Sequence, residues 1–286
     1  MNRKFIGVLV IVVWVAGLGL LYRRATHRTL AQELTEVGMR VSPETYYYSL
    51  EKNGVPIGVA ASSIDTSKTR VISSDLIRGK FPAGDTVFRI EARSEARFTR
   101  GMRLRDFVIR AYGDIKPFMI RGVMQEGEEK TLRVTTESLG VKPITTEAIA
   151  DAPVFIPTMA PLPLLLRREP EIGDSINVSM YDPMSRSLHD VTMRIEADSL
   201  FLVADSAALD SASGRWVKVH QDSLRGWRIT RRNGQLTAWV DASGRLIAAS
   251  EPGGISMVRT AFEIAFSNWR LDNPNSAPIP KRRRHR

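Results

Sequence analysis

Short runs of strand-forming residues, separated by turn residues at intervals of about 8–12 positions, fill most of this 286-residue chain. Val, Ile, Thr, Tyr and Phe are frequent in these runs. The dipeptide Asn53-Gly54 separates the first two, and it readily adopts the positive φ angles of a tight hairpin. Within residues 86–99, apolar and charged residues alternate, so the two faces of that strand should differ in polarity. The pattern predicts a mainly β protein with a large curved antiparallel sheet, or a two-part sheet, and a few short helices.

The expected strands fall into two groups. The first group is 46–50, 57–64, 69–78, 86–99, 102–112, 117–125 and 130–138, and the second is 175–180, 190–197, 199–204, 216–220, 226–230, 236–240, 245–250 and 255–259. Apolar residues at helical spacing predict short helices over 30–38 and 261–269.

A proline-rich apolar segment, residues 153–170, lies between the two groups, and regular strand is not expected in it. The favoured interpretation is an apolar loop or short helix that packs across the end of a sheet. The alternative is a ligand gate or a partner surface. In that alternative, the candidate partner-binding residues are Phe155, Leu162, Leu164 and Leu165.

An uncharged apolar run from Phe5 to Tyr22 has basic residues on both sides. As a helix, its 18 residues would span about 27 Å, close to the bilayer hydrocarbon thickness of about 30 Å. We therefore expect a single-pass membrane anchor, with a cleaved signal peptide as the alternative. The anchor residues include Phe5, Val10, Trp14, Leu18 and Tyr22.

The flanking charges hardly favour either orientation, but a long C-terminal domain is translocated largely regardless of charge. The expected location is therefore the bacterial inner membrane, with the body in the periplasm. The expected organisation is an anchor with basic flanks (1–28), a juxtamembrane helix or linker (29–43), a first β-rich half (44–152), the connector (153–170), a second β-rich half with a C-terminal helix (171–271), and a linker with a polybasic tail (272–286).

The formal net charge of +10 comes from the two ends of the chain, because residues 29–280 contain equal numbers of basic and acidic residues. A nucleic-acid-binding body would need a basic surplus of its own, so nucleic acid is not a favoured partner. The tail is a candidate for binding an anionic surface such as lipid head groups. Its residues are Lys281, Arg282, Arg283, Arg284 and Arg286.

The chain contains no cysteine, which excludes disulfides, thiolate metal sites and cysteine nucleophiles. It has no Gly-x-Ser-x-Gly motif, no phosphate-binding glycine motif and no histidine pair with metal-ligand spacing. We therefore expect no enzymatic activity, no cofactor and no metal. A hydrolase would require His189 or His220 to meet a serine and a carboxylate in one cleft.

Two segments, Trp239–Ile247 and Gly254–Ala265, resemble the β-rich extracytoplasmic domains that precede transglutaminase-like domains in bacterial envelope proteins. The opening residues Tyr47–Leu50, with Gly54 and Ile57-Gly58, resemble their first hairpin, and the likeness covers about residues 44–266. It implies a β-rich envelope module with no catalytic residues to transfer. The cysteine–histidine–aspartate domain of those proteins is absent from this sequence.

The sequence therefore predicts a non-enzymatic, membrane-anchored envelope protein. Its β-sheet face would bind a hydrophobic or polymeric ligand, such as a lipid-like molecule, or another envelope protein. The alternatives are a structural or assembly protein that bridges the membrane and an anionic surface through its tail, and a hydrolase.

Overall fold

The computed structural model describes residues 29–125, 130–150, 152–183, 185–231, 237–250 and 254–273. The expected anchor residues 5–22 and the basic tail 281–286 lie outside the described residues. Within the described ranges, no helix combines the length and the apolar character needed to cross a bilayer.

The structure is mainly β. Its strands are β1 (Glu44–Lys52), β2 (Val55–Thr66), β3 (Arg70–Ala83), β4 (Thr86–Thr99), β5 (Leu104–Gly113), β6 (Phe118–Met124), β7 (Thr131–Ser138), β8 (Val141–Ile149), β9 (Val154–Phe155), β10 (Ser175–Asp182), β11 (Ser187–Asp210), β12 (Arg215–Arg231), β13 (Thr237–Asp241), β14 (Leu246–Ser250) and β15 (Ile255–Thr260). The helices are α2 (Leu30–Arg40), α3 (Leu162–Leu166), the π-helix η1 (Glu263–Ser267) and α4 (Asn268–Asp272).

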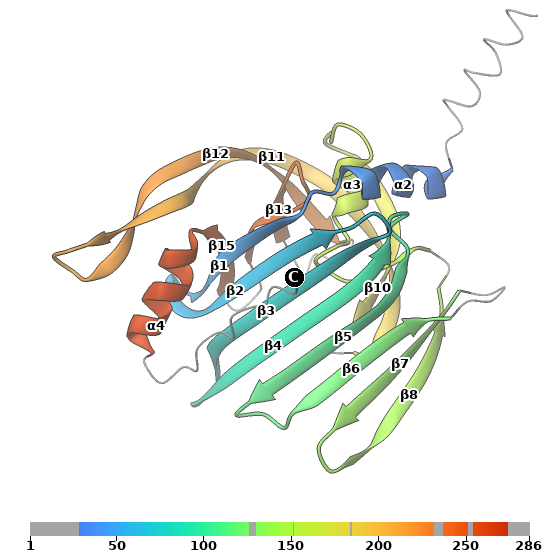
Figure 1. Cartoon of the computed structure of the whole chain (residues 1–286), viewed down its shortest axis with the longest axis horizontal. Coiled ribbons are helices and arrows are strands. Elements are labelled where there is room, and N and C mark those ends of the chain that lie inside the picture. The colour runs from blue at the N-terminus through green and yellow to red at the C-terminus, as the bar shows by residue number, and fades with distance from the viewer. Residues whose placement is uncertain are drawn as a thin grey trace, which may run out of the picture.

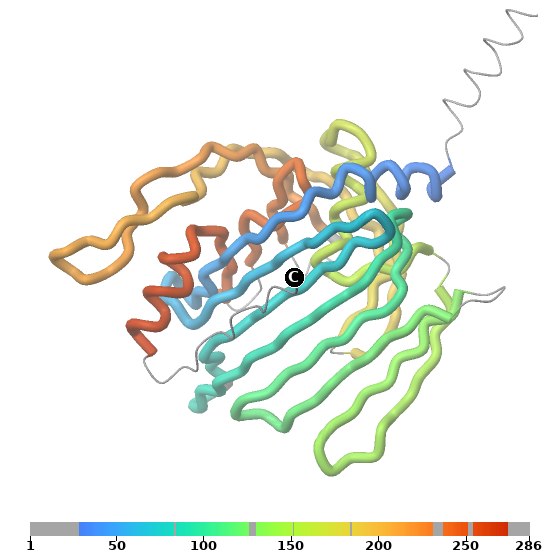
Figure 2. The backbone as a smooth tube through the Cα atoms, viewed as in Figure 1, coloured from blue at the N-terminus to red at the C-terminus, as the bar shows by residue number. Residues whose placement is uncertain are grey.

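In the described chain, these strands form one curved sheet in the order β8-β7-β6-β5-β4-β3-β2-β1-β15-β14-β13-β12-β11-β10-β9 (Figure 1). The parallel pair β9–β10 is the exception to antiparallel pairing. The two β-rich halves meet where β1 pairs with β15, so that Tyr48 lies opposite Arg259. Figure 2 shows this join as the blue strand beside the red one. The expectation of a large antiparallel sheet with few short helices is confirmed.

The predicted hairpin at Asn53-Gly54 connects β1 and β2. Both residues have positive φ, 51° for Asn53 and 79° for Gly54. Two consecutive positive φ angles match the right-handed twist of the adjoining strands, and Asn and Gly adopt them at low cost.

Helix α2 confirms the helix expected over 30–38 and extends two residues further. Its start is fixed by a capping box, in which the Thr29 side chain accepts from the Gln32 amide and the Gln32 side chain accepts from the Thr29 amide. Its buried side includes Leu34, Val37 and Gly38. At Gly38 the helix rests directly on the carbonyl of Arg100, where a Cβ atom would lie 1.8 Å from the oxygen.

The outer face of the first half carries charged residues and the C-terminal helices. Glu91 accepts hydrogen bonds from Arg78 (2.6 Å) and Arg93 (2.8 Å) and also contacts the Tyr112 hydroxyl. On β2, by contrast, Val59 packs against Phe266 and Trp269 of η1 and α4. The predicted helix over 261–269 is therefore confirmed, including its packing on the sheet.

Strands β11 and β12 continue beyond the rest of the sheet as a two-stranded ribbon. We call this ribbon, residues 199–210 and 215–225, the arm (Figure 1). Pairing with β10 ends at Arg194 and pairing with β13 ends at Gly226, so the arm strands pair with each other alone. Near the tip, the Trp216 backbone exchanges two hydrogen bonds with the Asn268 side chain, of 2.9 and 2.8 Å. Arg215 forms two further bonds to Asp272 of α4.

The second half differs from the sequence prediction in strand number. The predicted pairs 190–197 with 199–204, and 216–220 with 226–230, are each one continuous strand, because no turn occurs at 198 or at 221–225.

In the first half, strand β8 was not predicted. Almost all its residues are exposed, which removes the alternation of apolar and polar residues that would identify it.

Candidate functional site

One end of the space enclosed by the sheet is filled by residues 154–166, which we call the plug. It comprises β9, α3 and the residues between them. Its apolar side chains join one core cluster with residues from both halves of the sheet. For example, the Phe155 ring stacks on Phe98 of β4 at 5.9 Å between centroids. Helix α2 contributes Leu34 and Val37 to the same cluster and closes this end.

The candidate partner-binding residues of the plug occupy this core. Phe155, Leu162 and Leu164 are fully buried, and Leu165 is 2% exposed. The prediction of a partner surface made by these side chains is therefore wrong, because none of them reaches the surface. The favoured interpretation, an apolar loop or short helix that packs across the end of a sheet, agrees with the position of the plug.

Burial on the inner face of the sheet, the face toward the plug, decreases with distance from the plug. Along β3, Ser73 is 1% exposed, whereas Asp75 and Ile77 are partly exposed. Along β4, Phe98 and Ala96 are fully buried, whereas the next inner residues Ser94, Ala92, Ile90 and Phe88 are all partly exposed. The plug therefore fills one end of the inner face. Beyond it, the inner residues of β4 are partly exposed, whereas Ala60 of β2 and Ala111 of β5 stay buried. We call this part of the inner face, beyond the plug, the open half.

Asp75 lies at the boundary between the two parts. Its carboxylate accepts hydrogen bonds from Ser62 of β2 (2.6 Å), Ser94 of β4 (2.9 Å) and Thr158 of the plug (3.1 Å). Ser62 and Ser94 are the cross-strand partners of Asp75, so all three inner side chains form one row across the sheet. Thr158 itself is exposed, which places this polar row within reach of solvent.

Burial raises the pKa of Asp75, and the three hydroxyl donors, with Arg245 nearby, oppose this effect without cancelling it. The neighbouring Tyr48 hydroxyl is also buried, which raises its pKa. Arg245 is 6% exposed, and its Nε has no hydrogen-bond partner among the described residues. Asp75, Tyr48 and Arg245 therefore form an interior polar region with charges of both signs.

Below this polar row, the inner face is mostly apolar. The next inner row consists of Ala60, Ile77, Ala92, Ala111 and Phe118 on five neighbouring strands. Ile77, Ala92 and Phe118 are partly exposed, whereas Ala60 and Ala111 are buried. A pocket of about 480 Å³ adjoins this region at the ends of β5 and β6. It is lined by Ala111 and Phe118 from the inner face and continues to the turn at Leu139 and Gly140.

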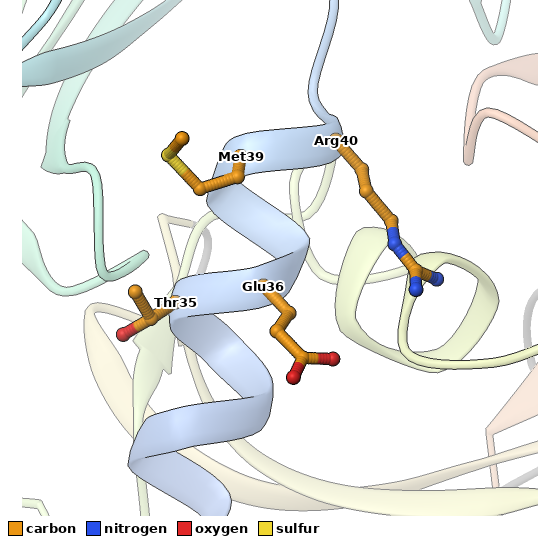
Figure 3. A pocket seen from close by; sticks show the side chains of 4 residues that line it. All are labelled: Thr35, Glu36, Met39 and Arg40. Atoms are coloured by element: carbon orange, nitrogen blue, oxygen red, sulfur yellow. The ribbon is translucent and has the colours of Figure 1, made fainter.

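Two other pockets lie away from the inner face. Among the described residues, those lining the first, of about 420 Å³, are Thr35, Glu36, Met39 and Arg40 of α2 (Figure 3). There Arg40 reaches across to α3 and donates to the carbonyl of Leu166 at 2.7 Å. The second, of about 330 Å³, lies between the outer face of β2–β4 and α4. The first pocket presents side chains of one helix, and the second is lined by Lys80 of β3 and by Asp272 of α4, which already accepts from Arg215 of the arm.

The two histidines of the body lie on separate exposed ribbons. His189 Nε2 is 2.7 Å from Ser187 Oγ and 3.1 Å from Ser185 Oγ, and Ser185 donates to the Asp182 carboxylate. His220 Nδ1 is 2.9 Å from Asp205 on the arm. Neither histidine adjoins a described pocket, so the geometry gives no support to the hydrolase alternative.

No protein-family model and no curated protein sequence matches this chain. Among solved structures, it is similar to a β-barrel-like protein of the domain of unknown function DUF1849 from Brucella abortus, at 11% identity and a TM-score of 0.49. That match covers 77% of this chain and 95% of the other. A DUF1089 family protein from Pseudomonas aeruginosa matches at 10% identity and a TM-score of 0.34, covering 68% and 90%. The resemblance to domains that precede transglutaminase-like domains stays a prediction.

The polar row was not predicted from the sequence, although its signal is present in the strand pattern. Ser62, Asp75 and Ser94 occupy inward positions of their strands, where an apolar residue is expected. A polar residue at a core position of three consecutive strands indicates a shared polar site. Finding it required the strand register, which the sequence alone does not fix.

Proposed function

We propose that this protein is a non-enzymatic, membrane-anchored envelope protein whose inner sheet face binds an amphipathic, lipid-like molecule. The observation that carries this proposal is the decrease in burial along β3 and β4, which leaves an apolar inner face partly exposed below a polar row. A soluble domain normally buries such a face or uses it for binding. The apolar part of the ligand would lie along Ile77, Ala92 and Phe118.

The polar end of the ligand would meet Asp75 and its hydroxyl donors. Apolar surface supplies most of the binding free energy in such sites, while a few polar groups fix the orientation. The plug supports this arrangement because it closes one end of the site and contributes Thr158 to the polar row.

A fluorescent dansyl-labelled fatty acid tests the proposal directly. We expect the wild-type protein to bind it with increased dansyl emission, and Ala92→Trp to weaken binding at least tenfold, because the indole would fill the open half. Glu95→Trp is the matched control, since Glu95 is an exposed residue of the same strand. It should bind as the wild type does. Ile90→Trp, at the next inner position, provides a second filling variant if Ala92→Trp folds poorly.

Absence of dansyl binding to the wild type, or equal binding by Ala92→Trp and Glu95→Trp, would contradict the proposal. The anchoring and the location have a separate test. Protease added to spheroplasts should digest the body if it faces the periplasm, whereas a protected body would place it in the cytoplasm.

A further inference from the structure

Three potential metal ligands meet on the arm, far along the chain from the inner-face site. Asp205 belongs to β11, and His220 and Asp222 belong to β12. One ligand atom from each lies within 4.8 Å of the other two. The His220 Nδ1 atom is 2.9 Å from the Asp205 carboxylate and 3.9 Å from Asp222 Oδ1.

Strand geometry explains why these side chains meet. His220 and Asp222 are two positions apart, so they point to the same face of β12. On the opposite strand, the register shifts between Ala204 and Ser206, and this leaves Asp205 as the extra residue of a β-bulge. A bulge redirects a side chain, and here the Asp205 carboxylate lies against the His220 ring.

The charges at this position favour a cation. Two carboxylates share one imidazole, so the group keeps a net negative charge even when His220 is protonated. All three side chains are exposed, which gives an ion direct access from solvent. The His220 imidazole is within hydrogen-bonding distance of the Asp205 carboxylate. The Asp222 Oδ1 atom is 3.9 Å from His220 Nδ1, which is too far for a hydrogen bond.

The distances also suit a transition metal ion. Zn²⁺ binds imidazole nitrogen and carboxylate oxygen at about 2.0–2.2 Å, which in a tetrahedral site separates neighbouring ligand atoms by roughly 3.3–3.6 Å. The separations of 2.9 and 3.9 Å lie on either side of this range, so small side-chain rotations would reach it. Mg²⁺ and Ca²⁺ prefer sites built from oxygen alone, and the imidazole therefore selects against them.

We propose that Asp205, His220 and Asp222 form a Zn²⁺ site that links the two strands of the arm. Water would complete the coordination. The site lies where, in the described chain, the arm strands pair only with each other and where the bulge interrupts that pairing. A bound ion would hold the ribbon together at its weakest point and make the arm more rigid.

Isothermal titration of the full-length, detergent-solubilised protein with zinc chloride tests this proposal. We expect one Zn²⁺ to bind to the wild type, and both His220→Ala and Asp222→Asn to weaken that binding at least tenfold. The matched control is His189→Ala, which removes an exposed histidine outside the arm that contacts Ser185 and Ser187. It should bind as tightly as the wild type.

Amide hydrogen exchange gives a second readout. Zn²⁺ should slow exchange in residues 199–210 and 215–225 of the wild type and leave exchange unchanged in His220→Ala. Absence of zinc binding to the wild type would overturn the proposal. So would equal affinity of wild type and His220→Ala, since the ion would then bind elsewhere. Neither result would bear on the inner-face site.

Discussion

Two carboxylates on neighbouring strands show how opposite surroundings produce opposite shifts in pKa. Burial acts to raise the pKa of Glu91, but bonds from Tyr112, Arg78 and Arg93 outweigh it and hold that pKa below its ordinary value. Asp75 has hydroxyl donors in place of arginines in direct contact, and burial prevails. Glu91 thus serves as a fixed charge on the outer face, whereas Asp75 is a group whose charge depends on pH.

Because the pKa of Asp75 is raised, the difference in unfolding free energy between the wild type and Asp75→Asn should depend on pH. The folded state holds the proton more tightly than the unfolded state, whose pKa is near 3.8. Stability from this group is therefore fully present at low pH and is lost as the pH rises through the folded pKa. Urea unfolding at a series of pH values should show the wild type losing stability relative to Asp75→Asn over this range. If the difference in unfolding free energy stayed constant with pH, the raised pKa of Asp75 would be contradicted.

The close contact between Gly38 and Arg100 predicts that adding one methyl group at position 38 destabilises the fold. In Gly38→Ala the new Cβ would lie 1.8 Å from the Arg100 carbonyl oxygen, so α2 would have to move away from the core. We expect a loss of about 1–3 kcal/mol in the free energy of unfolding. Gly101→Ala is the matched control, because its Cβ would have its nearest neighbour at 3.5 Å. Urea denaturation should leave that variant within about 0.5 kcal/mol of the wild type.

At the scale of elements, the ordered position of the arm depends on side-chain contacts near its tip. Its strands lack further sheet neighbours in the described chain. Its tip is held by the two bonds that the Asn268 side chain exchanges with the Trp216 backbone and by the bonds that Arg215 donates to Asp272. A free two-stranded ribbon is marginally stable at best in water. The contact with α4 therefore orders the arm near its tip, and the root of the arm in the sheet orders the other end.

Loss of the Asn268 side chain should loosen the arm selectively. Two hydrogen bonds worth about 0.5–1.5 kcal/mol each are removed in Asn268→Ala. We expect amide exchange in the arm to become about tenfold faster, with β3 and β4 unchanged. Asn177→Ala, which removes an exposed side chain bonded to Thr192 on another part of the sheet, should leave the arm as it is. Uniformly faster exchange throughout the body of Asn268→Ala would show a global loss of stability instead.

Elements with a strong local pattern were predictable from sequence, and elements defined by distant partners were not. Asn53-Gly54 identified its hairpin, and the spacing of Leu34 and Val37 identified α2. The length of β11 was missed because its polar stretch around Asp198 resembles a turn, although cross-strand pairing keeps it extended. The polar row was missed because Ser62, Asp75 and Ser94 become neighbours through the register of three strands.

For the whole molecule, the plug determines where a ligand could bind. The sequence identified residues 153–170 as an apolar segment unlike its surroundings, but it did not show which side of the sheet that segment occupies. In the structure, the plug fills one end of the inner face and leaves the open half partly exposed. Hydrophobicity alone could not locate this boundary, because Leu162 in the core and Ile77 in the open half are equally apolar in sequence.

The pairing of β1 with β15 has a consequence for how the chain reaches its folded state. These strands come from opposite ends of the folded body, so their contacts form only after almost the whole body has been synthesised. Before that, β1 and β14 each present an unpaired edge, which is a template for association with other chains. Sheets with such long-range pairing also fold slowly. A chain shortened before Ile255 would keep both edges open, and aggregation would be its expected fate.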